Sequence, residues 1–439
     1  MNLQSGLAYP PRYARGALGV LFMINLFNYV DRQIIFGVFP LVQQDLALSD
    51  AALGALGSAF MVLYMIASIP LGVVGDRSAR NRLIAIGVAV WGTATFLSGL
   101  ARSYGQLFAT RAVVGIGEAS YGPTATAMVS DFFPKARRGL VNGLFNAAIP
   151  LGGAIGVTLG GHVGARFGWR APFLIVGIPS LLLAGLAWRL GDPPRGGSDR
   201  AAAEGPRCAA PPVVGPAGLA AGIRGLLRTP TFVMVCAVGM LVAFATGAFA
   251  AWLPTYLHRV KQFALVEATL WYGMISAGGG LLGVIGGGYL GDALTRRTPA
   301  GHLLTIAGGF ILAGPFALVF LLHRDARIFL PALFFAVLFL LLYVGSVNAV
   351  IHNVVHPSLR ATAVAIFVFL IHLGGDALSP AIVGLISDRQ SLQGAMLLLP
   401  VIVLFAGLIT LAAAAAVDGD MRRVERSLLV AGGGPVPRG

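Results

Sequence analysis

Four ionisable residues interrupt two long apolar stretches of the sequence, where an unpaired charge is costly. Asp31 and Arg32 lie within the apolar run of residues 17–41, and Arg111 and Glu118 lie within a second such run. Each would cost about 3 kcal/mol if it faced lipid, so the four must face a packed interior or a wet cavity and pair with each other. Asp31 and Glu118 are therefore candidate proton-coupling carboxylates. Arg32 and Arg111 are candidates for binding the anionic head group of a substrate.

Helical spacing brings the charges of each segment to one face. At about 100° per residue, Asn28, Asp31 and Arg32 fall within an arc of about 120°, which makes Asn28 a further candidate for substrate binding. Arg111 and Glu118 are seven positions apart, so about 20° of rotation and about 10 Å of helix axis separate them. A structural ion pair that only fixes helix register is the competing interpretation.

The composition excludes a soluble protein. Only 11% of the 439 residues are charged and 57% are hydrophobic, with a mean hydropathy of +0.82, whereas soluble proteins carry about 25% charged residues. The net charge of +14 does not predict nucleic-acid binding, because the basic residues form short clusters between apolar segments and no continuous patch. Two cysteines exclude a disulfide framework and a four-cysteine metal site. We expect no cofactor and no metal.

Twelve segments are long and apolar enough to cross a membrane, which takes about 20 residues. The Pro-, Gly- and Arg-rich stretch 191–229 indicates a linker between two sets of six. We therefore predict an all-α membrane protein with an N-terminal six-helix bundle (1–190), a C-terminal six-helix bundle (230–417) and a tail (418–439). The twelve segments are residues 17–41, 51–75, 82–101, 105–130, 139–164, 171–190, 230–257, 266–290, 302–322, 328–351, 361–386 and 394–417.

Lys and Arg concentrate in the loops on the side of the two termini. Cytoplasmic loops of membrane proteins carry such an excess. This asymmetry predicts that both termini, the linker and the tail are cytoplasmic. We expect the chain to lie in the cell's inner (plasma) membrane.

Two loops of the sequence repeat each other. GVVGDRSAR (Gly72–Arg80) joins the second and third segments, and GYLGDALTR (Gly288–Arg296) joins the eighth and ninth, with Gly, Gly-Asp and Arg at the same spacing. Such a parallel repeat predicts two bundles related by a pseudo-two-fold axis along the membrane normal. In the fifth segment, Gly152, Gly156 and Gly160 recur every four residues, which predicts close helix packing.

These motifs resemble the major facilitator superfamily over nearly the whole chain. GVVGDRSARNR is similar to the superfamily signature Gly-x-x-x-Asp-Arg-x-Gly-Arg-Arg, with Ala79 in place of the last glycine. NYVDRQIIFGVFPLVQQDLALSD in the first segment and RAVVGIGEASYGP in the fourth look like the Spinster branch, whose members are associated with export of sphingosine 1-phosphate and lysophospholipids. The resemblance implies that the first and fourth segments line one cavity, where Arg32 and Glu118 are expected to approach each other.

The resemblance also implies an inner gate built from the repeated loops. Asp76 and Asp292 would bridge the two halves when the inner side is closed, with Arg80 and Arg296 four residues further on. Ion pairs of a gate must break in every transport cycle, and exposed pairs of modest strength suit this. Simple anchoring by cytoplasmic charge is the competing interpretation.

Further polar residues in the segments are candidates for substrate contact. They are Tyr121 in the fourth segment, Thr246 in the seventh, and Asn348 and His352 one turn apart in the tenth, where the resemblance implies a cavity lining. A solvated histidine at the inner mouth is the competing interpretation of His352. For Asp376 in the eleventh segment, a transport role and a polar partner within the C-terminal half are both open.

Together these features predict a proton-coupled secondary active transporter that works by alternating access. Its partners would be a lysolipid or another amphiphile with an anionic head group, of lysophospholipid or sphingosine 1-phosphate type, together with protons and the membrane lipids. The alternative is a proton-coupled transporter of small organic anions. We expect a monomer, and we expect neither an enzyme nor a catalytic residue, because the sequence has no Walker, His-Glu-x-x-His or Gly-x-Ser-x-Gly motif.

Overall fold

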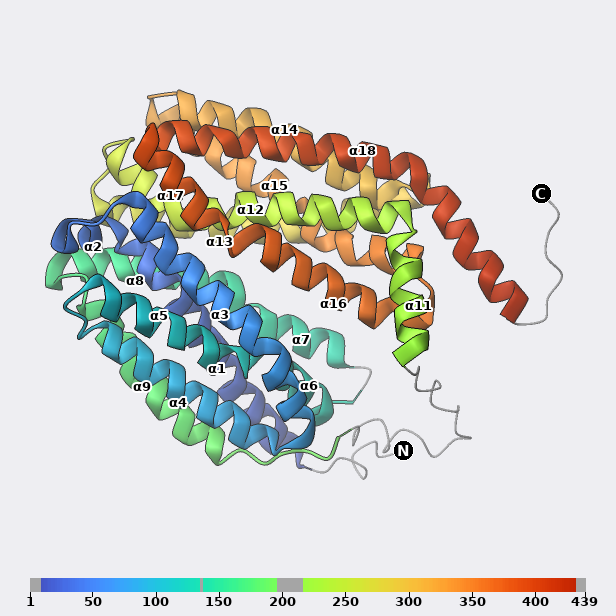
Figure 1. The fold of residues 1–439 in the computed structure, drawn as a ribbon, viewed down its shortest axis with the longest axis horizontal. Helices are drawn as coiled ribbons and strands as arrows, with labels where there is room; N and C mark the ends of the chain where they lie inside the picture. The colour runs from blue at the N-terminus through green and yellow to red at the C-terminus, as the bar shows by residue number, and fades with distance from the viewer. Residues whose placement is uncertain (1–8, 135–136, 196–215, 432–439) are drawn as a thin grey trace. The chain divides into compact units, whose positions relative to one another are not determined.

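The computed structural model describes residues 9–134, 137–195 and 216–431. In this part of the chain the regular structure is helical, without a β-strand (Figure 1). The packing divides the chain into two compact units. Unit 1 comprises Met1–Ala209, Ala250–Ala277 and Pro380–Arg389, and unit 2 comprises Ala210–Phe249, Gly278–Ser379 and Gln390–Gly439. Two stretches of the predicted C-terminal bundle therefore pack with the first half of the chain, and the predicted domain boundaries stay a prediction.

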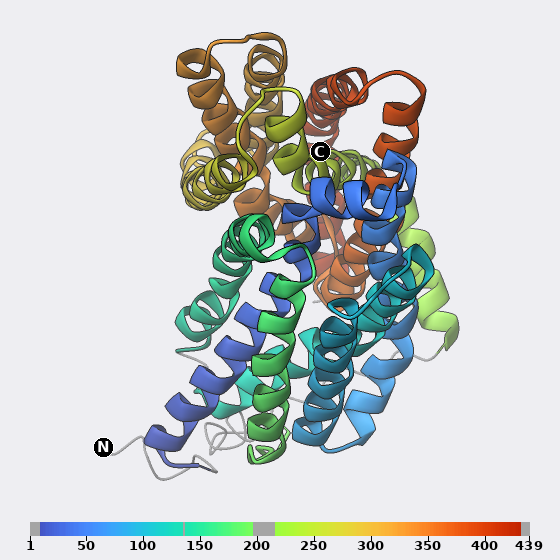
Figure 2. The ribbon, with the colours of Figure 1, turned by 90° about the vertical axis from the view of Figure 1, so that its left-hand side faces the viewer.

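Unit 1 is built mainly from helices of the first half of the chain, and Figure 2 shows two of them, α1 and α9, side by side. It adds the later part of α12 (Pro230–Arg259), the earlier part of α13 (Leu265–Thr295) and nearly all of α17 (Ser379–Arg389). Its other helices are α1 (Pro11–Gly37), α2 (Phe39–Leu46), α3 (Asp50–Arg77), α4 (Arg80–Ser98), α5 (Tyr104–Ala119), α6 (Gly122–Phe132), α7 (Arg138–Asn146), α8 (Ala148–Phe167) and α9 (Ala171–Trp188).

Unit 2 holds the remaining helices. In Figure 1, α14 and α18 run alongside each other. Part of the stretch that the sequence indicates as a linker is helical, since α11 lies within it. The helices of unit 2 are α11 (Pro216–Leu227), α14 (Gly301–Leu322), α15 (Ala326–Val354), the short turn η2 (Pro357–Leu359), α16 (Arg360–Ile371), the π-helix η3 (His372–Asp376) and α18 (Leu392–Ala431), with the first part of α12 and the last part of α13.

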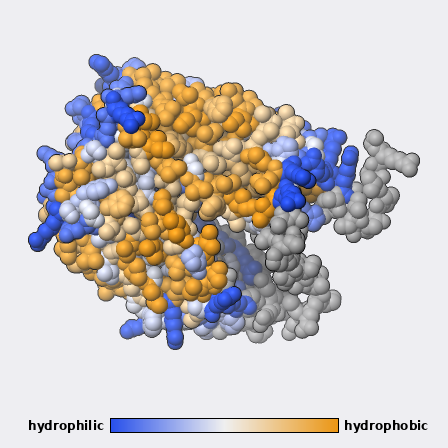
Figure 3. Space-filling model, in the orientation of Figure 1, coloured by the Kyte–Doolittle hydropathy of each residue, from blue (hydrophilic) through white to orange (hydrophobic). Residues whose placement is uncertain are grey.

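Every predicted span corresponds to helix. Within the described residues, nine helices have the length and hydropathy of a membrane span, and the other three predicted spans correspond to α1, to α4, and to α5 with α6. Apolar side chains gather on the exposed faces, as Figure 3 shows along α14 and α18, and such a surface is stable only against an apolar layer. Exposed examples on these two helices are Leu312, Val319, Val401, Phe405 and Leu408.

Four predicted spans are interrupted in the structure. The first ends as α1 at Gly37 and resumes as α2, the fourth breaks at Ser120 and Tyr121, and the fifth divides at Ala147. The eleventh contains the π-helix η3, a distortion that is frequent at functional sites. Hydropathy does not reveal these breaks, because the residues on both sides are equally apolar.

The glycine face predicted in the fifth span packs against α1. A Cβ on Gly152 would lie 2.7 Å from the carbonyl oxygen of Leu26, and one on Gly160 would lie 2.6 Å from that of Ile34. Between them, Gly156 faces the α1 backbone in the same way. Only glycine permits two helix backbones to approach so closely, so the prediction of close packing is confirmed.

A second glycine contact in unit 1 joins α3 to α17. A Cβ on Gly54 would clash with the carbonyl group of Pro380 and lie 2.9 Å from Cα of Ala381. On the other helix, a Cβ on Gly384 would lie 2.7 Å from the carbonyl carbon of Asp50. The two helices are therefore fitted backbone to backbone, and neither can gain a methyl group at this contact without moving away.

We predict that Gly54→Ala loosens this contact. Forcing a methyl group into a closed contact costs about 1–3 kcal/mol, so α17 should exchange its amide hydrogens faster than in the unaltered protein, as measured by hydrogen–deuterium exchange over residues 379–389. Gly19→Ala on α1 is the matched control, because a Cβ there meets nothing within 4 Å. Equal exchange of α17 in both variants would contradict the prediction.

Candidate functional site

The four charges of the first and fourth spans form two ion pairs between α1 and α5. Arg32 donates from Nη2 and Nε to Glu118 Oε2 at 2.8 and 3.2 Å. Arg111 donates from Nη1 to Asp31 Oδ1 at 3.0 Å and from Nη2 to the carbonyl oxygen of Asp31 at 3.3 Å. The expected approach of Arg32 and Glu118 is confirmed. The pairing of Arg111 with Asp31 was not predicted from the sequence.

The two pairs differ in their access to solvent. The side chains of Asp31, Arg111 and Glu118 are at most 1% exposed, whereas that of Arg32 is 14% exposed. Asp31 is held from a third helix as well, since its Oδ2 accepts a hydrogen bond from the buried Thr95 hydroxyl of α4. The Asp31–Arg111 pair is thus sealed, and Arg32 is the charge of the site that a ligand can reach first.

Aromatic rings surround the guanidinium group of Arg32. Its Cζ lies 4.9 Å from the ring centres of Tyr29 and Phe60 and 5.0 Å from that of Tyr64. Rings at this distance stabilise a cation through their negative faces. The guanidinium is therefore held by contacts that would persist if its carboxylate partner were exchanged for another anion.

Three buried polar atoms of the site have no hydrogen-bond partner among the described residues: Glu118 Oε1, Arg111 Nε and Asn28 Nδ2. Such atoms are rare in folded proteins because each one costs about 1–3 kcal/mol. They are the places where a water molecule, a proton or a polar ligand would be bound. In the same part of the chain, no group of three or more His, Cys, Asp or Glu side chains is arranged to hold a metal ion.

Tyr121 lies in the packing between helices and not on an open surface. It is 1% exposed, and its hydroxyl donates to the carbonyl oxygen of Leu21 at 2.5 Å. Its ring packs against Trp91 and Phe145, at 5.8 and 6.3 Å between centres. In this structure Tyr121 ties the break between α5 and α6 to α1, and its role in substrate binding stays a prediction.

The candidates of the second half of the chain lie in unit 2. Thr246 donates to the carbonyl oxygen of Val242 in its own helix at 2.9 Å, and the side chains of Asn348 and His352 on α15 are exposed. Asp376 lies 3.0 Å from Nδ1 of His372 within η3. This contact matches the polar partner within the C-terminal half that was one of the two interpretations of Asp376.

Of the gate residues in the first repeated loop, Arg80 is buried and linked within unit 1. It pairs with Asp131 at 2.6 Å and Asp192 at 2.8 Å, and it also donates to the carbonyl oxygen of Pro193. Arg80 therefore fastens the residues after α9 to the beginning of α4. The side chain of Asp76 lies outside the described residues, and a gating role of either residue stays a prediction.

In the second repeated loop, Asp292 and Arg296 are exposed. The carboxylate of Asp292, 75% exposed, lies 3.6 Å from Nε2 of His302 on α14. The other ring nitrogen of His302 is 3.2 Å from the Ser346 hydroxyl of α15. His302, which the sequence did not single out, thus connects the predicted gate aspartate to the interior of unit 2.

Asp50 forms a polar cluster, here called the Asp50 clasp, at the end of unit 1 where α3 begins. Its carboxylate accepts hydrogen bonds from Gln43 (2.8 Å), Arg259 (2.9 Å) and Ser387 (2.5 Å). Asp388 in turn accepts from the Asp50 amide at 2.8 Å. The clasp joins α3 to the ends of α12 and α17 beside the glycine contact described above.

The sequence does not reveal the Asp50 clasp, because its members are far apart in the chain. Their only local signal was a helix-capping pattern, since Ser49 accepts from the amide of Ala52. The contact extends inward through Trp252, which is fully buried and donates from Nε1 to the carbonyl oxygen of Pro380 at 3.0 Å.

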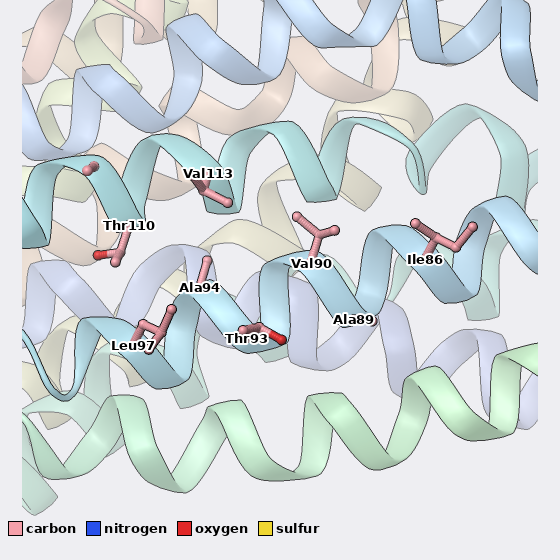
Figure 4. A pocket seen from close by; sticks show the side chains of 9 residues that line it. Ile86, Ala89, Val90, Thr93, Ala94, Leu97, Thr110 and Val113 are labelled. Atoms are coloured by element: carbon pink, nitrogen blue, oxygen red, sulfur yellow. The ribbon is translucent and has the colours of Figure 1, made fainter.

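An apolar groove of about 520 Å³ lies between α4 and α5 (Figure 4), and none of the four charged residues of the two ion pairs lines it. Its lining offers only the hydroxyls of Thr93 and Thr110 as polar groups, and the Thr110 hydroxyl donates to its own helix at Leu107. Ile86 and Leu97 in the lining are half exposed. A groove of this kind suits lipid chains and has no group that could bind a charged substrate.

We predict that Asp31→Asn strongly destabilises the protein. Removing one partner of a buried pair costs about 3–5 kcal/mol, because Arg111 is left charged and sealed from water. Asp45→Asn is the matched control, since Asp45 pairs with Arg170 at 2.9 Å with both side chains partly exposed, and such pairs are worth about 1 kcal/mol or less. The stability lost in each variant would be measured by unfolding the detergent-purified protein. Equal losses of stability in Asp31→Asn and Asp45→Asn would contradict the prediction.

Comparison with known proteins agrees with this architecture. Residues 21–375 match the Major Facilitator Superfamily. The chain is 31% identical to human Protein spinster homolog 1 (93% of this chain, 82% of the relative) and 32% identical to an MFS-type efflux pump of Mycolicibacterium smegmatis (89% and 90%). Its fold is similar to the crystal structure of a bacterial homolog to the human lysosomal transporter Spinster, inward-facing and unoccupied, with a TM-score of 0.83 and 24% identity over 94% of this chain and 99% of that one.

These matches confirm the predicted all-helical fold of twelve spans in two bundles, and they confirm that the chain is a transporter and not an enzyme. The chain belongs to the Major Facilitator Superfamily and, within it, to the Spinster-type membrane transporters.

Proposed function

We propose that this chain is a proton-coupled secondary active transporter of an amphiphile with an anionic head group, of lysophospholipid or sphingosine 1-phosphate type. It would work by alternating access as a monomer in the inner (plasma) membrane, with both termini cytoplasmic. One observation carries the proposal. A single oxygen of Glu118 holds the partly exposed Arg32, while the other oxygen is buried without a partner among the described residues.

This geometry couples substrate binding to protonation. When an anionic head group takes the guanidinium of Arg32, Glu118 is left as a carboxylate in a site sealed from water. A carboxylate in that position lowers its free energy by taking up a proton. When the head group leaves, Arg32 returns to Glu118 and displaces the proton, so each substrate exchange is linked to one protonation event at Glu118.

The Asp31–Arg111 pair has a different place in the proposal. Its burial and its bond to Thr95 favour the structural interpretation in this conformation, so that it fixes the height of α1 against α5. Proton coupling by Asp31 and substrate binding by Arg111 stay predictions for other steps of the cycle.

The surroundings of Arg32 support an amphiphilic substrate. Tyr29, Phe60 and Tyr64 place apolar surface directly beside the charge that would bind the head group, and an acyl chain could lie against such rings. A small organic anion would need only the charge, which is the alternative. Competition of transport by long-chain and short-chain anions separates the two, since only the first class should compete strongly if the amphiphile is the substrate.

The Asp50 clasp supports alternating access. In the proposed orientation it lies at the outer side, where its bonds hold α3, α12 and α17 together. The clasp would be closed while substrate is exchanged on the inner side and would open for exchange on the outer side. Asp292 with Arg296, and Asp76 with Arg80, would act at the inner side.

We predict that Glu118→Gln abolishes the proton dependence of transport. Uptake of a lysolipid into proteoliposomes would be measured with and without a pH gradient. The amide keeps the shape but cannot take a proton, so gradient-driven uptake should fall roughly 10- to 100-fold, which corresponds to about 1.4–2.8 kcal/mol of lost coupling between the gradient and transport. Asp45→Asn, a change at a partly exposed carboxylate, should leave the gradient effect intact. A gradient effect in Glu118→Gln equal to that of the unaltered protein would remove Glu118 from the mechanism.

A further inference from the structure

Helix α11 turns across the end of a membrane-spanning helix. It ends at Leu227, three residues before α12 begins at Pro230, and α12 has the length and hydropathy of a span. Figures 1 and 2 show that α11 does not continue the direction of α12 but runs across it. A helix that crosses the end of a span lies at the level of the lipid head groups, along the membrane surface.

One side of α11 is packed against unit 2. A Cβ on Gly222 would lie 2.8 Å from a methyl group of Leu359 in the η2 turn. Leu226, one helical turn later, is 3% exposed and lies on the same side. The packing of this side sets the rotation of α11 about its own axis. It therefore determines which residues lie on the opposite side.

The opposite side carries two arginines and a leucine. Arg224 and Arg228 are exposed and one turn apart, and they lie about 200° and 240° around the helix from Gly222. Leu227, 62% exposed, lies beside them. The sequence has no acidic residue between Glu204 and Glu267. Asp420, whose carboxylate accepts from the amide of Thr231 at 2.9 Å, is only 3% exposed and lies in the packing at the start of α12.

We infer that the face formed by Arg224, Leu227 and Arg228 binds the anionic lipids of the membrane surface. The arginines would bind lipid phosphates, and Leu227 would enter the boundary of the acyl chains. An apolar side chain between bases is typical of helices that lie in this interface. Leu227 lies at the level where the lipid chains begin, so lipid offers it an apolar surface that a soluble protein partner would not. The lipid surface therefore fits this face better than a soluble protein does.

The test uses the full chain in nanodiscs, with hydrogen–deuterium exchange followed over residues 222–228. In discs that contain phosphatidylglycerol, exchange should be roughly tenfold slower than in discs of phosphatidylcholine alone, from the attraction of two bases to an anionic surface. R224Q/R228Q should lose this difference, and R224K/R228K, which keeps the charge, should retain it. Leu227→Gln should raise exchange in both kinds of disc.

R324Q/R327Q is the matched control. It removes the same charge from two exposed arginines near the turn between α14 and α15, and it should leave the phosphatidylglycerol effect on α11 unchanged. Equal exchange of residues 222–228 in the two lipid compositions would overturn the inference, as would an effect that persists in R224Q/R228Q. If R224Q/R228Q does not fold, the L227Q result and the lipid dependence of the unaltered chain still decide it.

Discussion

The need to neutralise four charges between α1 and α5 governs the arrangement of unit 1. Each charge alone would cost several kcal/mol in a medium of low dielectric constant, so only a packing that closes both pairs at once is stable. The two helices must therefore agree in rotation and in height, because a shift of one turn would separate both Arg32 from Glu118 and Arg111 from Asp31. The hydrogen bond of Thr95 to Asp31 then brings α4 into the same register.

Close packing on the other side of α1 serves the same constraint. The glycines of α8 let its backbone approach α1 directly, so α1 is held between a charged contact and a backbone contact. The contact of α1 with α8 and its ion pairs with α5 would respond differently to a ligand. The glycine contact has no alternative partner, whereas the exposed side of Arg32 can accept another anion.

Features of a single helix, such as its position in the chain and its polar face, could be predicted from the sequence. Contacts between helices could not. Hydropathy located all twelve spans, and helical spacing placed Asp31 and Arg32 on one face. Spacing gives rotation but not the relative height of two helices, so the pairing of Arg111 with Asp31 could not be predicted. Nothing among 26 Phe and 10 Tyr singles out the rings around Arg32. The Asp50 clasp joins residues more than 300 positions apart, and Arg80, chosen from a motif, is buried in a contact with residues that follow α9.

In the proposed cycle an anionic ligand replaces Glu118 at Arg32, and Glu118 then takes up a proton. Infrared difference spectroscopy of the purified protein, with and without an ether-linked lysolipid that has no ester carbonyl of its own, observes this directly, because a protonated carboxyl group has a carbonyl band that a carboxylate lacks. We expect such a band to appear on ligand addition and to be absent in the Glu118→Gln variant. A spectrum in which the ligand binds without that band, or in which the band persists in the variant, would contradict it.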